Sequence, residues 1–409
     1  MPSAALASVR RRDIARTADY RQTSNHSAVL QAVLDHGPVA RSTIARLAGL
    51  SPAAVTRLSA ELMAAGLVRE SAQAAGPKAV GRPHVPVEID TSRSVACGLH
   101  ITGRYSTLAL LDLRGRVIAQ ERLPHDLGTG PRRVISRAAR RMPEFLAQWG
   151  GGRTPVGLGV AAGGWVDGAD GVIVEHARLG WHGVPARQLL EEATGLPVRV
   201  DNHARALARA EQLFGDPRAR ASVVQLFVAN MIDAAFATDG KVHRGPQSAA
   251  GAVAHLPLTG RTERCACGRR GCLQAAVASD ELSERAARAG ITEEPSFDAL
   301  LAAAQRGDRR AVSLFHERAR LVGAAAGLLL DLFNPEVLVV VEAGVTQLPG
   351  CLAALRAEVC ERSGRRVDPG RAIVATSFAD SIGPMAAGAV ILDAVYADPL
   401  RWAARSQAQ

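Results

Sequence analysis

The sequence predicts an α/β protein in which a small winged helix-turn-helix domain precedes a larger domain of two lobes. Three short amphipathic helices are expected between residue 24 and about residue 70. From about residue 91, apolar strands alternate with helices, and a similar run of segments begins after residue 220. We therefore expect a basic flexible arm at residues 1–23, a DNA-binding domain at 24–90 and a two-lobed domain with a cleft at 91–409.

Size and composition fit a globular cytoplasmic protein. The chain has 409 residues, of which 47% are hydrophobic and 22% charged, so more than one hydrophobic core is expected. No apolar run reaches the roughly 18 residues that would span a membrane, and the first residues contain no signal-peptide core. The formal net charge of +10 favours a polyanionic partner such as nucleic acid.

The segment from residue 24 to residue 64 has the signals of a helix-turn-helix unit. A first helix ends at a Gly-Pro pair, and a second, from about Arg41, is expected to bury Ile44 and Leu47. The stretch GLSP at residues 49–52 then supplies a glycine turn, a serine N-cap and a proline for the first position of a third helix. Two helices joined by such a turn form the unit whose second helix enters the major groove of DNA.

The third helix is the expected recognition helix. Its outward face has small and polar side chains, of which Thr56 and Arg57 are the best candidates for contacts with bases or phosphates. A strand, a loop and a second strand follow as a wing, and the arginine at the loop tip suits the adjacent minor groove. The candidate DNA-contacting residues are Ser42, Thr43, Ser51, Ala53, Ala54, Thr56, Arg57, Ser59, Gly81, Arg82 and Pro83. A small packing domain without DNA contact is the alternative.

The stretch HLPLTGRTERCACGRRGC at residues 255–272 predicts a structural zinc site. Cys265, Cys267 and Cys272 lie within eight residues, and the glycines between them allow the backbone to fold tightly. His255 can supply the fourth ligand, and a closed Cys3His set leaves no position for a catalytic water. A cluster of reduced cysteines beside a histidine is the alternative. The three other cysteines, at positions 97, 351 and 360, are expected to be buried as small apolar side chains.

From Val95 onward the sequence resembles the ROK family, which is named for repressors, open reading frames and sugar kinases. The resemblance covers essentially the whole chain, because the residues 255–272 match the family's zinc signature and the winged helix-turn-helix is similar to the DNA-binding half of the family's repressors. It implies a two-lobed actin/hexokinase-like (ribonuclease H-like) fold for the ROK domain. It also implies zinc as a structural cofactor and operator DNA and a sugar or sugar derivative as partners.

The groups that the family's kinases use for phosphoryl transfer have changed in this chain. Their Asn-Asp pair, whose aspartate is the catalytic base, is matched by Asn202-His203. Their two phosphate loops are matched by HITGR at residues 100–104 and by ANMIDAA at residues 229–235, the second without any glycine. Glu342 would place a carboxylate near the nucleotide. We therefore expect no enzymatic activity and no catalytic residue.

The sugar pocket of the family is matched in part. Asn202, His255 and a Gly-Gly turn are kept, whereas Arg178 and Gln274 replace an asparagine and a glutamate. Arg178 and His203 add hydrogen-bond donors and positive charge, which favours an acidic, phosphorylated or oligomeric sugar. The candidate ligand-binding residues are Gly163, Gly164, Arg178, Asn202, His203, His255 and Gln274. A relic cleft without a ligand is the alternative.

Together these features predict a DNA-binding transcriptional regulator, with repression of sugar-related genes as the expected role. Two winged heads need two half-sites, so we expect a homodimer on double-stranded DNA with an inverted repeat; a tetramer is the alternative assembly. Two other hypotheses stay open. One is an ATP-dependent sugar kinase that carries a DNA-binding head, and the other is a scaffold that binds partner proteins through its zinc lobe.

Overall fold

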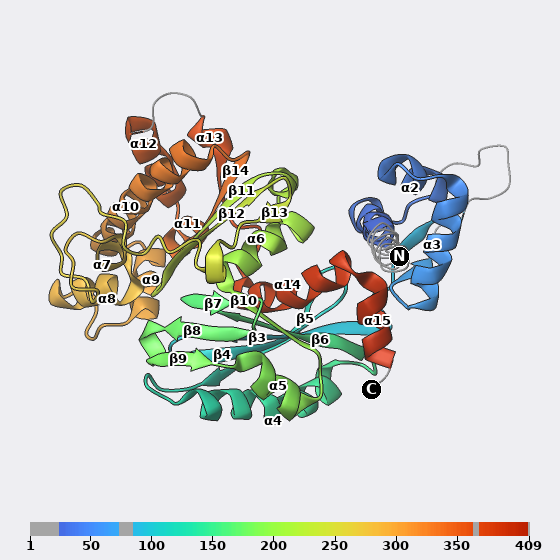
Figure 1. Ribbon diagram of the computed structural model, residues 1–409. Coiled ribbons are helices and arrows are strands. Elements are labelled where there is room, and N and C mark those ends of the chain that lie inside the picture. The colour runs from blue at the N-terminus through green and yellow to red at the C-terminus, as the bar shows by residue number, and fades with distance from the viewer. Residues whose placement is uncertain (1–23, 73–84, 363–367, 408–409) are drawn as a thin grey trace, which may run out of the picture.

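The computed structural model describes residues 24–72, 85–362 and 368–407. Within them a small N-terminal head lies beside a body of two lobes (Figure 1). The predicted α/β fold with an N-terminal winged helix-turn-helix is confirmed. The basic arm expected at residues 1–23 and the wing tip at Gly81, Arg82 and Pro83 lie outside the described residues.

The head consists of three helices and a two-stranded sheet. Its elements are a helix over residues 24–36, α2 (Arg41–Ala48), α3 (Pro52–Ala64), β1 (Val68–Glu70) and β2 (Val87–Ile89). Gly49 ends α2 with a left-handed φ of 65°, a conformation that favours glycine, and the Ser51 side chain accepts a hydrogen bond from the Ala54 N–H at the start of α3. These two local signals produce the turn between α2 and α3. The strands β1 and β2 pair antiparallel and form the base of the wing.

The first lobe is built on a five-stranded sheet in the order β10-β6-β3-β4-β5. Helices cover both faces of this sheet: α4 and α5 pack on one face, and α6 and α14 on the other. A small three-stranded sheet lies at its edge. The elements of this lobe are β3 (Ser94–Ile101), β4 (Tyr105–Leu111), β5 (Val117–Pro124), α4 (Pro131–Trp149), β6 (Thr154–Ala162), β7 (Trp165–Asp167), β8 (Val172–His176), β9 (Trp181–Val184), α5 (Ala186–Thr194), β10 (Val198–Asn202), α6 (His203–Phe214), α14 (Ile382–Ala397) and α15 (Pro399–Gln407).

The second lobe repeats the architecture of the first, as the similar run of segments after residue 220 predicted. Its sheet has the order β13-β12-β11-β14-β15, with the same pattern of parallel and antiparallel neighbours. A core beneath the helices α10 and α12 covers one face of this sheet. The elements are β11 (Val223–Val228), β12 (Ile232–Thr238), β13 (Lys241–Val242), α7 (Leu273–Val277), α8 (Ser279–Arg288), α9 (Phe297–Gln305), α10 (Arg309–Phe333), β14 (Val337–Val341), α11 (Ala343–Gln347), α12 (Cys351–Arg362), α13 (Pro369–Ala372) and β15 (Ile373–Ala375).

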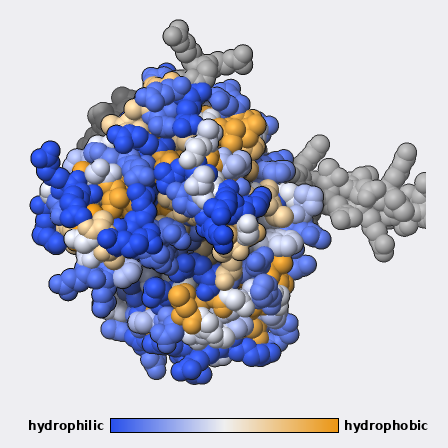
Figure 2. All heavy atoms as spheres, turned by 90° about the vertical axis from the view of Figure 1, so that its left-hand side faces the viewer, coloured by the Kyte–Doolittle hydropathy of each residue, from blue (hydrophilic) through white to orange (hydrophobic). Residues whose placement is uncertain are grey.

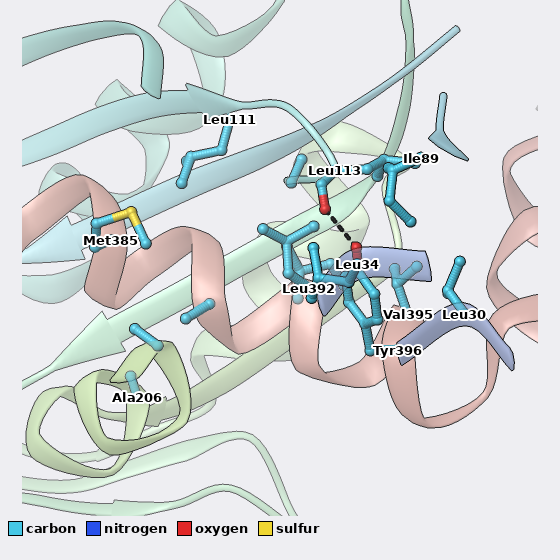
Figure 3. Close-up of a cluster of buried hydrophobic side chains, with 14 of the residues drawn as sticks. Leu30, Leu34, Ile89, Leu111, Leu113, Ala206, Met385, Leu392, Val395 and Tyr396 are labelled. Atoms are coloured by element: carbon cyan, nitrogen blue, oxygen red, sulfur yellow. Dashed lines mark hydrogen bonds between the residues drawn. The ribbon is translucent and has the colours of Figure 1, made fainter. Parts of the chain in front are cut away.

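The head shares a hydrophobic core with the body, a contact that the sequence did not predict. Leu30 and Leu34 from the helix over residues 24–36 pack near Leu392 and Tyr396 of α14 (Figure 3). The Tyr396 hydroxyl donates a hydrogen bond of 2.7 Å to the carbonyl of Leu113, in the turn between β4 and β5. That hydrogen bond fixes α14 within the body, and the head is held against the body by buried apolar surface.

Two polar contacts made by charged side chains also join the head to the body. The Arg114 guanidinium donates to the carbonyl of Leu34 over 3.1 Å, and Arg220 forms an ion pair of 2.8 Å with Asp35. Both arginines belong to the body and both partners to the last turns of the helix over residues 24–36. The orientation of the head is thus tied to the first lobe and to the segment that precedes β11.

The outer surface is mostly hydrophilic, with small separate apolar patches, on the face that lies on the left of Figure 1 (Figure 2). Among the described helices, none combines the length and the apolar character needed to cross a membrane.

Candidate functional site

The recognition helix α3 presents polar and small side chains to solvent. Thr56 and Arg57 are both exposed, and the Arg57 side chain keeps 55% of its accessible surface. The Arg57 guanidinium forms an ion pair of 2.6 Å with Glu61, one turn later, and the Thr56 hydroxyl donates to the carbonyl of Pro52 over 2.9 Å. Both side chains can therefore exchange a partner within their own helix for a phosphate or a base edge.

Glu61 connects this exposed face to the core of the head. Its second carboxylate oxygen lies 2.6 Å from Nε2 of His26, which is buried. Partial burial raises the pKa of Glu61, but the hydrogen bonds and the charges of His26 and Arg57 together outweigh burial, and the net pKa is lowered. The carboxylate is thus ionised near neutral pH and holds Arg57 along the helix surface.

Two expectations for the helix faces are wrong. Ser59 was expected on the DNA-facing side of α3, but its side chain is fully buried, because it follows Val55 by four residues and precedes Leu62 by three. Leu47 was expected to be buried, but 42% of its surface is exposed at the end of α2. Ser59 is therefore removed from the candidate DNA contacts.

The Cys3His stretch folds into a compact cluster of four donor atoms. The ligand atoms of His255, Cys265, Cys267 and Cys272 all lie within 4.8 Å of one another. Nδ1 of His255 is 3.6 Å from Sγ of Cys265, and Sγ of Cys267 is 3.8 Å from Sγ of Cys272. A tetrahedral zinc with bonds of about 2.3 Å to sulfur and about 2.0 Å to nitrogen would separate its ligands by roughly these distances. The four residues can therefore hold a metal ion, and their donor set fits zinc.

The surroundings of the cluster favour thiolate at one position and thiol at another. Hydrogen bonds from the backbone and side chain of Arg269 lower the pKa of Cys267 to about 6, whereas burial raises the pKa of Cys272 to about 11. Among the other cysteines, Cys97 and Cys351 are buried as expected, but Cys360 is exposed in the last turns of α12. The expectation of a buried Cys360 is wrong because that position faces away from the α10 side of the helix.

Two neighbouring cavities lie between the lobes. The larger, about 650 Å³, is called here the cleft cavity, and it brings together most of the expected ligand-binding residues. These are Gly164, Arg178, Asn202, His255 and Gln274. The smaller, about 380 Å³, is called the histidine pocket; Gly163 and His203 lie in its wall, with His100 and His176.

Several of the expected sugar contacts are already engaged within the protein. Asn202 caps α6 by accepting a hydrogen bond of 2.8 Å from the Ala204 N–H, and its side-chain amide donates to the carbonyl of Gly164. The Gln274 side chain donates to the carbonyl of Asn230 over 2.7 Å. Gly164 has a φ of +80° beside the cleft, a left-handed conformation that explains why a glycine is needed there. These residues shape the wall of the cleft cavity.

The positive charge expected in the cleft is balanced by two carboxylates that the sequence did not predict. Arg178 forms an ion pair with Asp280 at the start of α8, on the opposite lobe. Nε2 of His203 lies 2.8 Å from Oδ2 of Asp233, and the His203 ring packs on Phe227 with ring centres 3.9 Å apart. Neither partner could be found from spacing, because they lie 102 and 30 residues away in the sequence.

Asp233 places a carboxylate next to His203, the residue that stands where the family's kinases have their catalytic aspartate. It accepts hydrogen bonds from His203 and from the Gly164 N–H. Burial raises its pKa, but the hydrogen bond and charge of His203 and the hydrogen bonds from Gly164 and Asn202 together outweigh burial, and the net pKa is lowered. Chemically, a histidine paired with a carboxylate can accept a proton. The loss of the aspartate at position 203 therefore does not by itself remove proton-transfer chemistry from the cleft.

Glu342 does not present a free carboxylate to the neighbouring cavity. It forms an ion pair of 2.9 Å with Arg318, both side chains are 1% exposed, and its carboxylate also accepts a hydrogen bond of 2.7 Å from the Val345 N–H. The expected negative charge near a nucleotide is thus neutralised by a buried arginine. The segment at residues 229–235, expected as a phosphate loop, consists of the turn at 229–231 and the first four residues of β12, and residues 102–104 link β3 to β4; both turns border the histidine pocket.

Comparison with known proteins identifies the family. The model of the ROK family matches residues 96–394, which is more than half of the chain. The chain belongs to the ROK family. It is 35% identical to the transcriptional regulator Rv0485 of Mycobacterium tuberculosis, over 93% of this chain and 88% of that protein. It is 26% identical to the DNA-binding transcriptional repressor Mlc of Escherichia coli, over 92% of this chain and 95% of that protein.

Solved structures of ROK proteins support the same fold. A ROK family transcriptional regulator, described as a homologue of the Escherichia coli Mlc protein, matches with a TM-score of 0.77 and 24% identity, over 94% of this chain and 99% of that chain. A ROK hexokinase from Thermus thermophilus matches with a TM-score of 0.57 and 26% identity, over 73% of this chain and 99% of its own. The match to the regulator thus covers a larger share of this ROK chain than the match to the hexokinase does.

Proposed function

We propose that this ROK protein is a DNA-binding transcriptional regulator, with repression as its expected mode, that responds to a sugar-type ligand. The observation that carries the proposal is the winged helix-turn-helix head, whose α3 leaves Thr56 and Arg57 exposed, packed onto a ROK body. Its relatives named as a transcriptional regulator and as a repressor extend over the head as well as the body. The remaining candidate contacts are Ser42, Thr43, Ser51, Ala53 and Ala54, together with the wing residues Gly81, Arg82 and Pro83.

Selection of genomic fragments on the purified protein tests this proposal. Fragments that contain an inverted repeat are expected to be enriched, and their binding is expected to weaken steeply as the salt concentration rises. The genes next to the enriched fragments would then indicate which sugars to test as ligands. If no fragment binds in a salt-dependent way, the regulator proposal fails and the scaffold hypothesis gains support.

A sugar kinase that carries a DNA-binding head is the second candidate. The His203–Asp233 pair favours it, because this pair could accept the proton of a sugar hydroxyl. Against it stand the segment at residues 229–235, which has no glycine, and the neutralised Glu342 beside the histidine pocket. An assay that couples ATP consumption to a panel of sugars separates the candidates. Turnover at an ordinary enzymatic rate would establish the kinase, and we expect none.

We also propose that His255, Cys265, Cys267 and Cys272 bind a structural zinc ion. The four donors are contributed by one continuous stretch, and the antiparallel bridge between Pro257 and Cys272 holds its two ends together. A Cys3His set has no open coordination position, so the ion would stabilise this loop without taking part in chemistry. Metal analysis of the purified protein is expected to give one zinc per chain.

The assembly proposed for DNA binding is a cytoplasmic homodimer, with a tetramer as the alternative. Each chain has one head, and an inverted repeat requires two heads related by twofold symmetry. The helix α14 (Ile382–Ala397) is largely buried between the first sheet, α6 and the head, so it does not supply an exposed dimer surface. Light scattering on the free protein and on its complex with a selected fragment would measure the number of chains.

A further inference from the structure

The described part of the head has no surplus of positive charge, although the whole chain has a formal net charge of +10. Residues 24–72 and 85–89 contain as many arginines as carboxylates. They are Arg41, Arg46, Arg57 and Arg69, with Asp35, Glu61, Glu70 and Glu88. Attraction to phosphates is electrostatic and independent of sequence, so a head with balanced charge gains less from nonspecific DNA than a basic one.

Three of these arginines are held by carboxylates within the head. The pairs are Arg41–Glu70, Arg57–Glu61 and Arg69–Glu88, with distances of 2.8, 2.6 and 2.9 Å between nitrogen and oxygen. The first and third pairs end on the wing strands β1 and β2, whereas the second lies within the recognition helix. Arg57 and Glu61 are the two charged side chains of α3, so this helix is neutral as a whole.

Glu61 is fixed from the side of the core. Its Oε2 lies 2.6 Å from Nε2 of His26, which is buried, and its Oε1 lies 2.6 Å from the guanidinium of Arg57. His26 belongs to the helix over residues 24–36, whose apolar side chains are part of the core shared with the body. The Glu61 side chain is 32% exposed, against 55% for Arg57. Arg57 can therefore swing away from the helix surface, while the carboxylate of Glu61 stays in place.

The fixed carboxylate affects two kinds of DNA contact differently. When Arg57 leaves Glu61 for a phosphate, a negative charge remains four residues away, about 6 Å along the helix, and repels that phosphate. A guanine edge presents O6 and N7 as uncharged acceptors, which the carboxylate repels far less. Glu61 therefore reduces the gain from a phosphate contact more than the gain from a guanine contact.

We propose that Glu61 is a specificity-determining residue of α3: held by His26, its carboxylate makes Arg57 favour a guanine edge over a phosphate. This inference rests on the regulator function proposed above, and it names the residue that separates specific from nonspecific binding by the head. Glu61 acts through Arg57 and need not touch DNA. Removal of its charge is expected to strengthen binding to any duplex more than binding to a selected fragment.

Two variants of the full-length protein remove the charge. Glu61→Gln keeps the length of the side chain and an oxygen that can accept a hydrogen bond from His26, so the head is expected to fold, with the melting temperature as the check. Glu61→Ala is the second variant, because alanine suits the interior of a helix. Glu144→Gln is the matched control, since it breaks a similar ion pair with Arg141 on α4, outside the head.

Fluorescence anisotropy with two duplexes of equal length measures the effect. One is a fragment selected from the genome, and the other has the same bases in scrambled order. The specificity ratio, which is the dissociation constant for the scrambled duplex divided by that for the selected one, is expected to fall about fivefold or more in both Glu61 variants. The salt dependence of binding to the scrambled duplex is expected to steepen by about one phosphate contact per head. Glu144→Gln should change neither quantity.

A double-mutant cycle separates this role from a purely structural one. In the Arg57→Ala background no guanidinium is left to redirect, so Glu61→Gln is expected to leave the specificity ratio unchanged there. An equal fall of the ratio in both backgrounds would overturn the proposal. Specific binding by Glu61→Gln with the ratio of the wild type would overturn it as well and leave the regulator function standing. Absence of any salt-dependent DNA binding by the wild type would instead overturn the regulator function, and this inference with it.

Discussion

Arg57 is the side chain on which DNA recognition by α3 depends most. It is exposed, and among the described residues its ion-pair partner is Glu61. An ion pair of this kind contributes about 0.3–0.5 kcal/mol within a helix, so a phosphate or a guanine can displace that partner at little cost. Arg57→Ala is therefore expected to weaken binding to a selected fragment by about 1–3 kcal/mol, a factor of roughly 5 to 150. Fluorescence anisotropy over a series of salt concentrations would measure the loss. Arg140→Ala, on α4, is the control that should bind normally.

The role of Cys267 as a ligand predicts a loss of stability before any loss of DNA contact. Cys267→Ser removes one of four donors from a cluster whose ligand atoms lie within 4.8 Å, so the zinc content and the melting temperature are both expected to fall. Cys360→Ser replaces an exposed cysteine outside the cluster and should change neither. Metal analysis and thermal unfolding of the two variants measure the effect. A Cys267→Ser protein with full metal content and stability would rule out the proposed coordination.

The buried histidines predict a loss of stability in mild acid. The pKa of His176 is lowered from 6.5 to about 4, so between these values the unfolded chain takes up a proton that the folded protein refuses. Stability is therefore full above about pH 6.5 and falls as the pH falls toward 4; from pH 7.5 to 5.5 the loss is about 1.4 kcal/mol for such a histidine.

Comparison of two variants isolates this contribution. The difference in melting temperature between pH 7.5 and pH 5.5 is expected to shrink in His176→Phe and to stay as in the wild type in His243→Gln, at an exposed position. An unchanged difference in His176→Phe would mean that this ring gains its proton in the folded protein at an ordinary pH.

At the scale of elements, α14 packs so closely against the first sheet at one position of β6 that only a glycine fits there. A Cβ added at Gly159 of β6 would lie 2.1 Å from the carbonyl oxygen of Ala387, a contact that requires the helix or the strand to move. Gly159→Ala is expected to destabilise the protein by about 1–3 kcal/mol. Thermal unfolding would show a lower midpoint, whereas Gly130→Ala, where the structure has no atom within 4 Å of the new Cβ and φ is −60°, should cost little.

Elements set by local chemistry could be predicted from the sequence, and contacts between distant elements could not. The turn before α3 is encoded by Gly49, Ser51 and Pro52, and the Cys3His cluster by one stretch of 18 residues. Asp233 and Asp280 were missed as partners of His203 and Arg178 because only the closing of two lobes brings them together. The polar side chain of Ser59 indicates an exposed position, but its helical spacing from Val55 and Leu62 puts it on the buried face of α3.

At the scale of the whole molecule, the head and the ROK body form one structural unit in which α14 is common to both cores. A ligand can release DNA only to the extent that it binds the DNA-incompetent arrangement more tightly, so a site must be mechanically connected to the head to act. The cleft cavity and the histidine pocket both lie between the lobes, but the described lining of the histidine pocket includes the first turn of α14.

The central claim, that this ROK protein reads DNA through α3 as a pair of heads, is tested most directly by a protection footprint on a fragment selected from the genome. The account predicts two protected half-sites of an inverted repeat, with centres one helical turn of about 10 base pairs or a multiple of it apart, and loss of both in Arg57→Ala. A single protected site, or protection that Arg57→Ala leaves intact, would contradict it.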